Sequence, residues 1–152
     1  MWEKLKNLLA APGGSNRLTE TKPDLKVAVS AVLLEMANAD GEFDPSERET
    51  IVVLLRDQFD LGAAEVEDLI ALTEAERAKV PDLWPFTNAI ARTYTPEEKQ
   101  EVLVMVWQVV FADARLDPHE EMLVRKLQLM LAVNHSVVIE AKTSARAAGP
   151  VA

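Results

Sequence analysis

Apolar residues recur every three to four positions along most of this 152-residue chain, in runs that polar or Pro- and Gly-containing segments interrupt. This spacing is typical of helices with one buried face, and clusters of strand-favouring residues are few. The pattern therefore predicts an all-α protein, a compact bundle of about seven to eight helices. We expect the helices at 1–10, 24–39, 44–59, 63–79, 86–93, 96–112, 117–131 and 134–147.

Turn and capping residues mark several of these helix starts. Thr95 is followed by Pro96 and two glutamates, which combines an N-cap residue, a proline in the first turn and acids that favour a helix N-terminus. Pro81 and Pro85 predict a turn before the short helix at 86–93. The helix at 96–112 is apolar on nearly all sides, so we expect it at the centre of the domain.

One acidic segment occurs twice, as Ala39–Glu47 (ADGEFDPSE) and Ala112–Glu120 (ADARLDPHE). Asp, Asp, Pro and Glu recur in register, and each copy ends one apolar helix and begins another. The repeat indicates one helix–loop–helix unit used twice. The two pseudo-repeated halves are 24–80 and 96–147, joined by 81–95.

Helix capping explains four of the six carboxylates in these segments. Asp44 and Asp117 are good N-caps, and Glu47 and Glu120 stand at the third position after them, where their side chains can reach back to the cap. Such an arrangement stabilises each helix start by about 1–2 kcal/mol. A purely structural role for these four residues is therefore one open interpretation.

Asp40 and Asp113 fit capping less well. Each follows the C-terminal end of a helix, where the helix dipole disfavours an anion by about 0.3–1 kcal/mol. A positive group should compensate, and it can be a loop amide, a basic side chain or a bound cation. The two copies thus also allow a second interpretation, a cation site.

Carboxylates at this spacing across a tight turn can converge on a hard ion such as Ca²⁺ or Mg²⁺. Zinc is disfavoured because the chain has no cysteine and neither histidine stands at ligand spacing. The segments are not EF-hand loops, since Met36 and Val109 would take the first ligand position. The candidate metal ligands are Asp40, Asp44, Glu47, Asp113, Asp117 and Glu120.

The net charge of −9 makes nucleic acid an unexpected partner and favours cations or basic protein surfaces. The absence of cysteine removes disulfides and thiol catalysis. The sequence also offers no nucleophile elbow, no phosphate-binding glycine loop and no His-centred triad, so we expect a non-enzymatic protein. No apolar run reaches the roughly 18 residues of a spanning helix, and a cytoplasmic location is expected.

The segment 1–23 is interpreted as a short amphipathic helix and a polar linker, ahead of a helical domain at 24–147 and a frayed tail at 148–152. One face of the first helix carries four apolar residues, with Lys4 and Lys6 beside it. Such a helix can dock on a membrane surface or on a protein partner, or fold back on the acidic body. The apolar residues are Trp2, Leu5, Leu8 and Leu9.

The duplicated acidic turn resembles that of the TerB-like tellurite-resistance family, and the likeness covers about 25–147. The resemblance implies a compact helical cytoplasmic domain whose six motif carboxylates form an acidic face, proposed in the family to bind divalent ions. It also implies stress-response roles, including resistance to tellurium oxyanions, and membrane-bound partners. The second copy departs from the pattern, because Ala114 replaces the glycine and Arg115 brings a positive charge.

We therefore expect a non-enzymatic stress-response module whose acidic face binds divalent cations or a basic protein. The alternative is a membrane-associated adaptor that docks through the N-terminal helix, at the periphery of the inner membrane.

Overall fold

The computed structural model describes residues 25–38, 45–113 and 118–149. Within these residues the chain forms seven α-helices and one 3₁₀ turn, with no strand, which confirms the predicted all-α bundle. The expected helix at 1–10 lies outside the described residues. The elements are α2 (Leu25–Ala37), α3 (Pro45–Phe59), α4 (Ala63–Ala78), α5 (Trp84–Thr93), α6 (Pro96–Val110), the 3₁₀ turn η2 (Phe111–Asp113), α7 (Pro118–Met130) and α8 (His135–Ala148).

One predicted cap is present in the structure and one predicted turn is not. Thr95 Oγ1 accepts the Glu98 N–H at 3.2 Å, and Glu98 Oε1 accepts the Thr95 N–H at 2.8 Å, so the predicted cap of α6 is confirmed. The predicted turn at Pro85 is wrong, because Pro85 lies inside the first turn of α5. The N–H groups of the first turn have no partner within the helix, so the missing N–H of proline costs nothing there. The fixed φ angle of proline also suits a helix.

The sequence repeat is also a repeat of helices. Pro45 begins α3 and Pro118 begins α7. Along the sequence, the offset between these two prolines aligns α3 with α7. The same shift brings α2 onto α6 and α4 onto α8, with small differences at the ends. Each half therefore has the same order of three helices, and α5 connects them.

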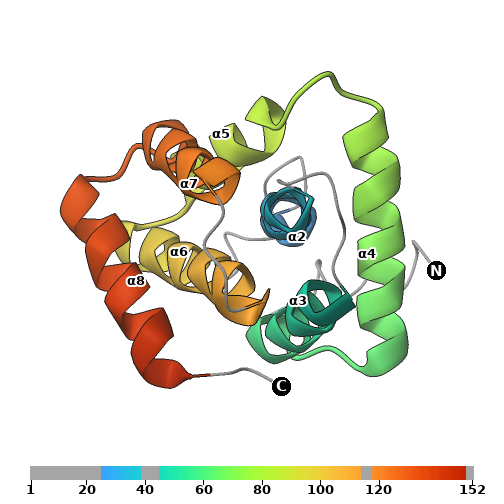
Figure 1. The fold of residues 1–152 in the computed structure, drawn as a ribbon. Helices are drawn as coiled ribbons and strands as arrows, with labels where there is room; N and C mark the ends of the chain where they lie inside the picture. The colour runs from blue at the N-terminus through green and yellow to red at the C-terminus, as the bar shows by residue number, and fades with distance from the viewer. Residues whose placement is uncertain (1–24, 39–44, 114–117, 150–152) are drawn as a thin grey trace.

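Helix α2 occupies the centre of the bundle and is seen end-on in Figure 1, with α3, α4, α5 and α6 packed around it. Eleven of its thirteen residues are buried, against eight of fifteen in α6. The sequence predicted the central place for 96–112, but α6 shares the centre and keeps an exposed side. The reason is that α6 carries acids in its first turns, whereas α2 has no charged residue between Lys26 and Glu35.

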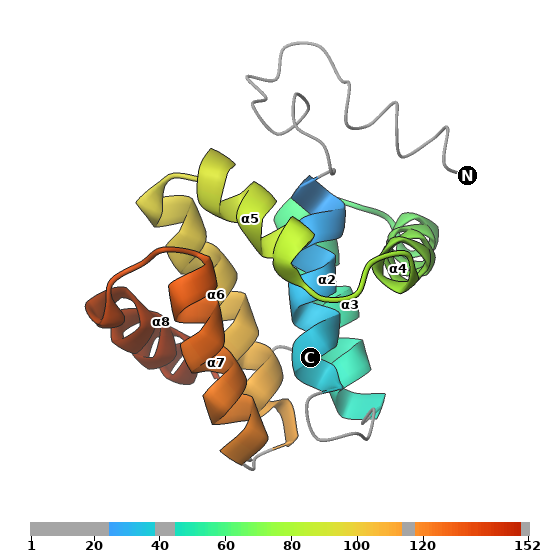
Figure 2. The ribbon, with the colours of Figure 1, turned by 90° about the horizontal axis from the view of Figure 1, so that it is seen from above.

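The two central helices run in the same direction, and α3 and α7 return from the end where α2 and α6 finish (Figure 2). Helix α3 packs against η2 at this end. The described residues that flank the two acidic segments therefore lie together at one end of the bundle.

Two of the described helices end with a non-glycine residue that has a positive φ angle. Asp60 has φ 54° after α3, and Ala132 has φ 58° after α7. In each case the next N–H bonds back to a carbonyl of the preceding turn, Leu61 to Arg56 at 3.0 Å and Val133 to Gln128 at 3.2 Å. This closes the last turn of the helix and satisfies its free carbonyls.

Candidate functional site at the paired acidic segments

The structure describes the side chains of two of the six predicted ligands. Asp40, Asp44 and Asp117 lie outside the described residues, and so does the side chain of Asp113, whose backbone is the last residue of η2. Glu47 and Glu120 are both described.

Glu47 and Glu120 are the third residues of α3 and α7, the positions that the capping pattern predicted. Their relative exposures are only 1% and 2%. Both residues take part in an interaction. A buried carboxylate needs one, because transfer of a charge out of water is costly unless polar or charged groups replace the water. The first turns of α3 and α7 thus each carry an acidic group inside the bundle, and not on its surface.

The described residues that flank the two copies of the motif are neighbours in space. Because α3 packs against η2, the helix that follows the first acidic segment touches the turn that leads into the second. Figure 2 shows the starts of α3 and α7 at the same end. This placement is required if the two segments are to share one surface or one ion.

Among residues 25–38, 45–113 and 118–149, no three His, Asp or Glu side chains come together as a metal site. The oxygen donors of the motif are of the kind that hard cations prefer, and the chain has no sulfur donor from cysteine. Any cation at this end would therefore depend on Asp40, Asp44, Asp113 and Asp117 together with the described Glu47 and Glu120.

Basic side chains gather at the end of α6, a feature that the sequence interpretation missed. Lys142 Nζ lies 4.9 Å from the ring centre of Trp107, and the Arg146 guanidinium carbon lies 5.3 Å from that of Phe111. The two rings stack with centres 5.6 Å apart. These cations of α8 lie near the C-terminal end of α6, where the helix dipole is negative and a positive charge is stabilising. The chain itself therefore supplies positive groups at this end, just before Asp113.

The end of α2 has a basic side chain as well. Arg77 Nε, on α4, lies 3.3 Å from Oε1 of Glu35, and its Nη1 donates to the carbonyl of Val80 at 3.1 Å. These residues line a cleft of about 400 Å³ between α2 and α4, together with Asn38 and Thr73. Glu35 and Arg77 lie far apart in the chain, so the sequence gives no signal for this pair.

Charge is unevenly distributed over the described helices. Residues 45–79 hold nine acidic and four basic residues, whereas 118–149 hold three acidic and four basic ones. The first group lies on α3 and α4 and the second on α7 and α8, at opposite sides of α2 (Figure 1). The negative charge of these two groups is therefore concentrated on the first half of the repeat.

The fold and the doubled acidic motif define a helical bundle with an internal repeat. Residues 26–143, most of the chain, match the family model described as tellurite resistance protein TerB. The chain therefore belongs to the TerB family, and the resemblance carried by the doubled motif is confirmed. No curated protein matches the chain. No solved structure matches it either. In the part of the chain that the structure describes, no helix is long and apolar enough to cross a membrane.

Proposed function

We propose that this chain is a non-enzymatic, cytoplasmic stress-response module of the tellurite-resistance type, whose paired acidic segments bind a divalent cation or a basic protein partner. The packing of α3 against η2 carries the proposal, because it brings the flanks of both segments to one end of the bundle. Membership of the TerB family supports the link to stress response.

The cations at the end of α6 favour the first segment over the second as the stronger ion site. Lys142 and Arg146 supply positive charge next to the second segment, and Arg115 lies within it. A cation bound there would meet electrostatic repulsion from these groups. The second segment is then better suited to complete a site centred on the first, or to meet a protein.

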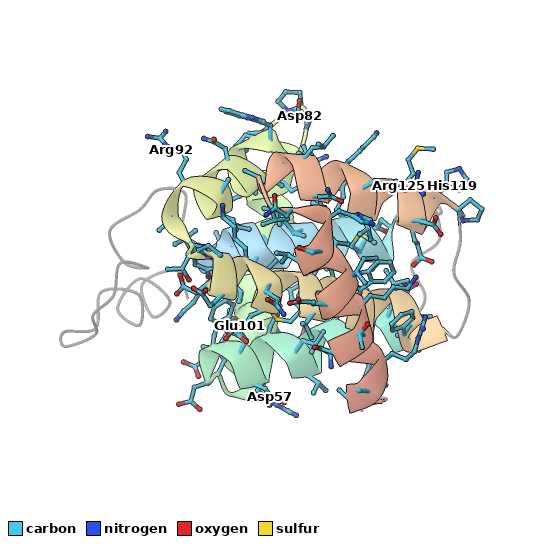
Figure 3. All side chains as sticks on the ribbon, turned by 90° about the vertical axis from the view of Figure 1, so that its left-hand side faces the viewer. Asp57, Asp82, Arg92, Glu101, His119 and Arg125 are labelled. Carbon is cyan, nitrogen blue, oxygen red and sulfur yellow. The ribbon has the colours of Figure 1, made fainter. Side chains whose placement is uncertain are left out.

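Isothermal titration of the full chain with Ca²⁺, Mg²⁺ and Mn²⁺ tests the cation part. We expect saturable heat and a raised melting temperature in wild type, and at least about a tenfold loss of affinity in Asp40→Asn with Asp113→Asn. Asp57→Asn with Glu101→Gln removes the same charge at residues that Figure 3 places away from this end, and should bind as wild type does. Absence of heat and of any thermal shift at millimolar ion would leave only the basic partner.

The alternative function, a membrane-associated adaptor, depends on the N-terminal segment with Trp2, Leu5, Leu8 and Leu9. Its apolar face and flanking lysines are the observation in its favour. Co-sedimentation with anionic liposomes compares the full chain with a chain that begins at Asp24. Equal partitioning of the two would rule out this mode of docking.

A further inference from the structure

The outward side of α7 carries two large apolar side chains with two cations between them. Met122 is 58% exposed and Leu129 is 79% exposed, one heptad apart on the same face of the helix. Arg125 and Lys126 are exposed on the same face, between them along the axis. Figure 3 shows Arg125 projecting from the outer edge of α7. We call these four residues the α7 stripe.

Such a stripe is unusual on a chain of this composition. Four large apolar residues of the described part are strongly exposed, and two of them belong to the α7 stripe. Single exposed apolar residues need no explanation, but an aligned pair can anchor a helix on another surface. The cations between the pair favour an acidic surface. The one described ion pair of the stripe, between Arg125 and Glu121 at 3.4 Å, is solvent-exposed and therefore weak.

The exposed flank of α4, beside α3 and the cleft between α2 and α4, has the complementary features. Ala71 and Ala78 are exposed one heptad apart, and exposed Glu74 lies between them. The pattern continues toward the helix start with exposed Ala64 and Glu67, and Glu67 already pairs with Arg48 of α3 at 2.8 Å. Alanines leave room for Met and Leu side chains between two helices, and Glu74 lies between the two alanines as the cations lie between Met122 and Leu129 in the α7 stripe. One heptad spans about 10.5 Å on both helices.

We propose that copies of this chain associate head to tail, with the α7 stripe of one copy packed on the exposed flank of α4 of the next. The two surfaces lie on opposite sides of α2, so they cannot meet within one molecule (Figures 1 and 2). Their opposite charge follows the division already seen, in which 45–79 is acidic and 118–149 is slightly basic. A contact between different surfaces leaves one of each free and continues into an open chain of copies.

The association is weak by its size. One helix packed on another buries well under the roughly 1,200 Å² of a stable complex, so we expect a weak, concentration-dependent association. Because opposite charges guide the contact, added salt should weaken it. The fraction of associated copies then depends on the local concentration of the protein, and it rises where several copies are held together.

Sedimentation velocity of the full chain in EDTA, from about 10 µM to about 1 mM, tests the proposal, since the chelator removes any bridging cation. We expect the average mass to rise with concentration and to fall with added salt. Met122→Ser with Leu129→Ser, and separately Arg125→Glu with Lys126→Glu, should weaken association by about tenfold or more. Ile139→Ser is the matched control, because it removes an apolar residue of α8 that is 46% exposed and lies outside both surfaces. It should leave association unchanged.

A charge exchange between the two surfaces gives the decisive result. Glu74→Lys alone should also prevent association, because the new positive charge on α4 repels the cations of the α7 stripe. An equimolar mixture of Glu74→Lys with the Arg125→Glu, Lys126→Glu variant should associate again. Unchanged melting temperatures of the single proteins show that each remains folded.

The proposal is overturned if wild type stays monomeric over this range, or if the mixture of reversed charges does not associate. Binding of wild type to anionic vesicles, lost in Met122→Ser with Leu129→Ser while no self-association occurs, would instead assign the α7 stripe to a membrane surface. It would equally overturn the proposal.

Discussion

Glu47 and Glu120 occupy the same position of two helices in the repeated halves, and both are almost fully buried. Each is the last residue of an acidic segment. Helix α3, which carries Glu47, packs against η2, the turn that follows α6 in the other half. The repeat therefore keeps an acidic group inside the bundle in each half. Both glutamates lie in the first turn of their helix, where the helix dipole favours an anion.

Glu47→Gln and Glu120→Gln should each lower the free energy of unfolding by about 1–3 kcal/mol, because each removes a buried charge from its partners and from the positive end of a helix. Glu49→Gln, at an exposed position of α3, should change it by less than about 0.5 kcal/mol. Urea denaturation measures all three. Equal, small effects at the buried and exposed positions would contradict a structural role of the repeat glutamates.

The Glu35–Arg77 pair should show a coupling free energy of about 0.5–1 kcal/mol in a double-mutant cycle with Glu35→Gln and Arg77→Met. Both side chains are about one-third exposed, which limits the strength of the pair. Arg77→Met should cost more than Glu35→Gln, because it also removes the hydrogen bond to the Val80 carbonyl. Single changes whose effects simply add would show that the two charges do not interact in solution.

The pH dependence of stability should reveal the Arg48–Glu67 pair between α3 and α4. Two hydrogen bonds from Arg48, at 2.8 and 3.3 Å, hold the pKa of Glu67 below its ordinary value of 4.5. A carboxylate with a lowered folded-state pKa contributes its stability above the ordinary value, and loses it as pH falls through the lowered one.

The pair is solvent-exposed, so Glu67→Gln should cost at most about 0.5 kcal/mol at pH 7. The difference between wild type and the variant should shrink as pH falls from about 5 to about 3, and shrink also in high salt. Thermal melts across this range provide the measurement. A difference that stays constant with pH would mean that Glu67 is not held ionised by Arg48.

Ala132→Gly should raise the free energy of unfolding by about 0.5–1 kcal/mol. Ala132 has φ 58°, where a Cβ atom is strained and glycine is not, and this gain exceeds the entropy that glycine loses on folding. Ala71→Gly, at an exposed interior position of α4, is the matched control and should cost about 1 kcal/mol. The idea fails if both changes destabilise equally.

The helices were predictable because their signals are local. The spacing of apolar residues, the Thr95 cap and the doubled acidic motif place α3, α6 and α7 nearly where they occur. The misplaced start of α5 and the 3₁₀ turn after α6 arise at helix ends, where one hydrogen bond decides the boundary. Asp82, for example, accepts the Trp84 N–H at 3.0 Å and starts α5 earlier than the prolines suggested.

The sequence alone determined the helical class, the internal repeat and the residues of the acidic motif, because each depends on neighbours along the chain. Only the tertiary structure decided that α2 is the central helix, that Glu47 and Glu120 are buried, and that α3 meets η2 at one end. The same is true of the Glu35–Arg77 pair and of the cations of α8 on the rings of Trp107 and Phe111. These contacts join residues that lie far apart in the chain, and their energy depends on packing and on the low dielectric of the bundle interior, which no local pattern records.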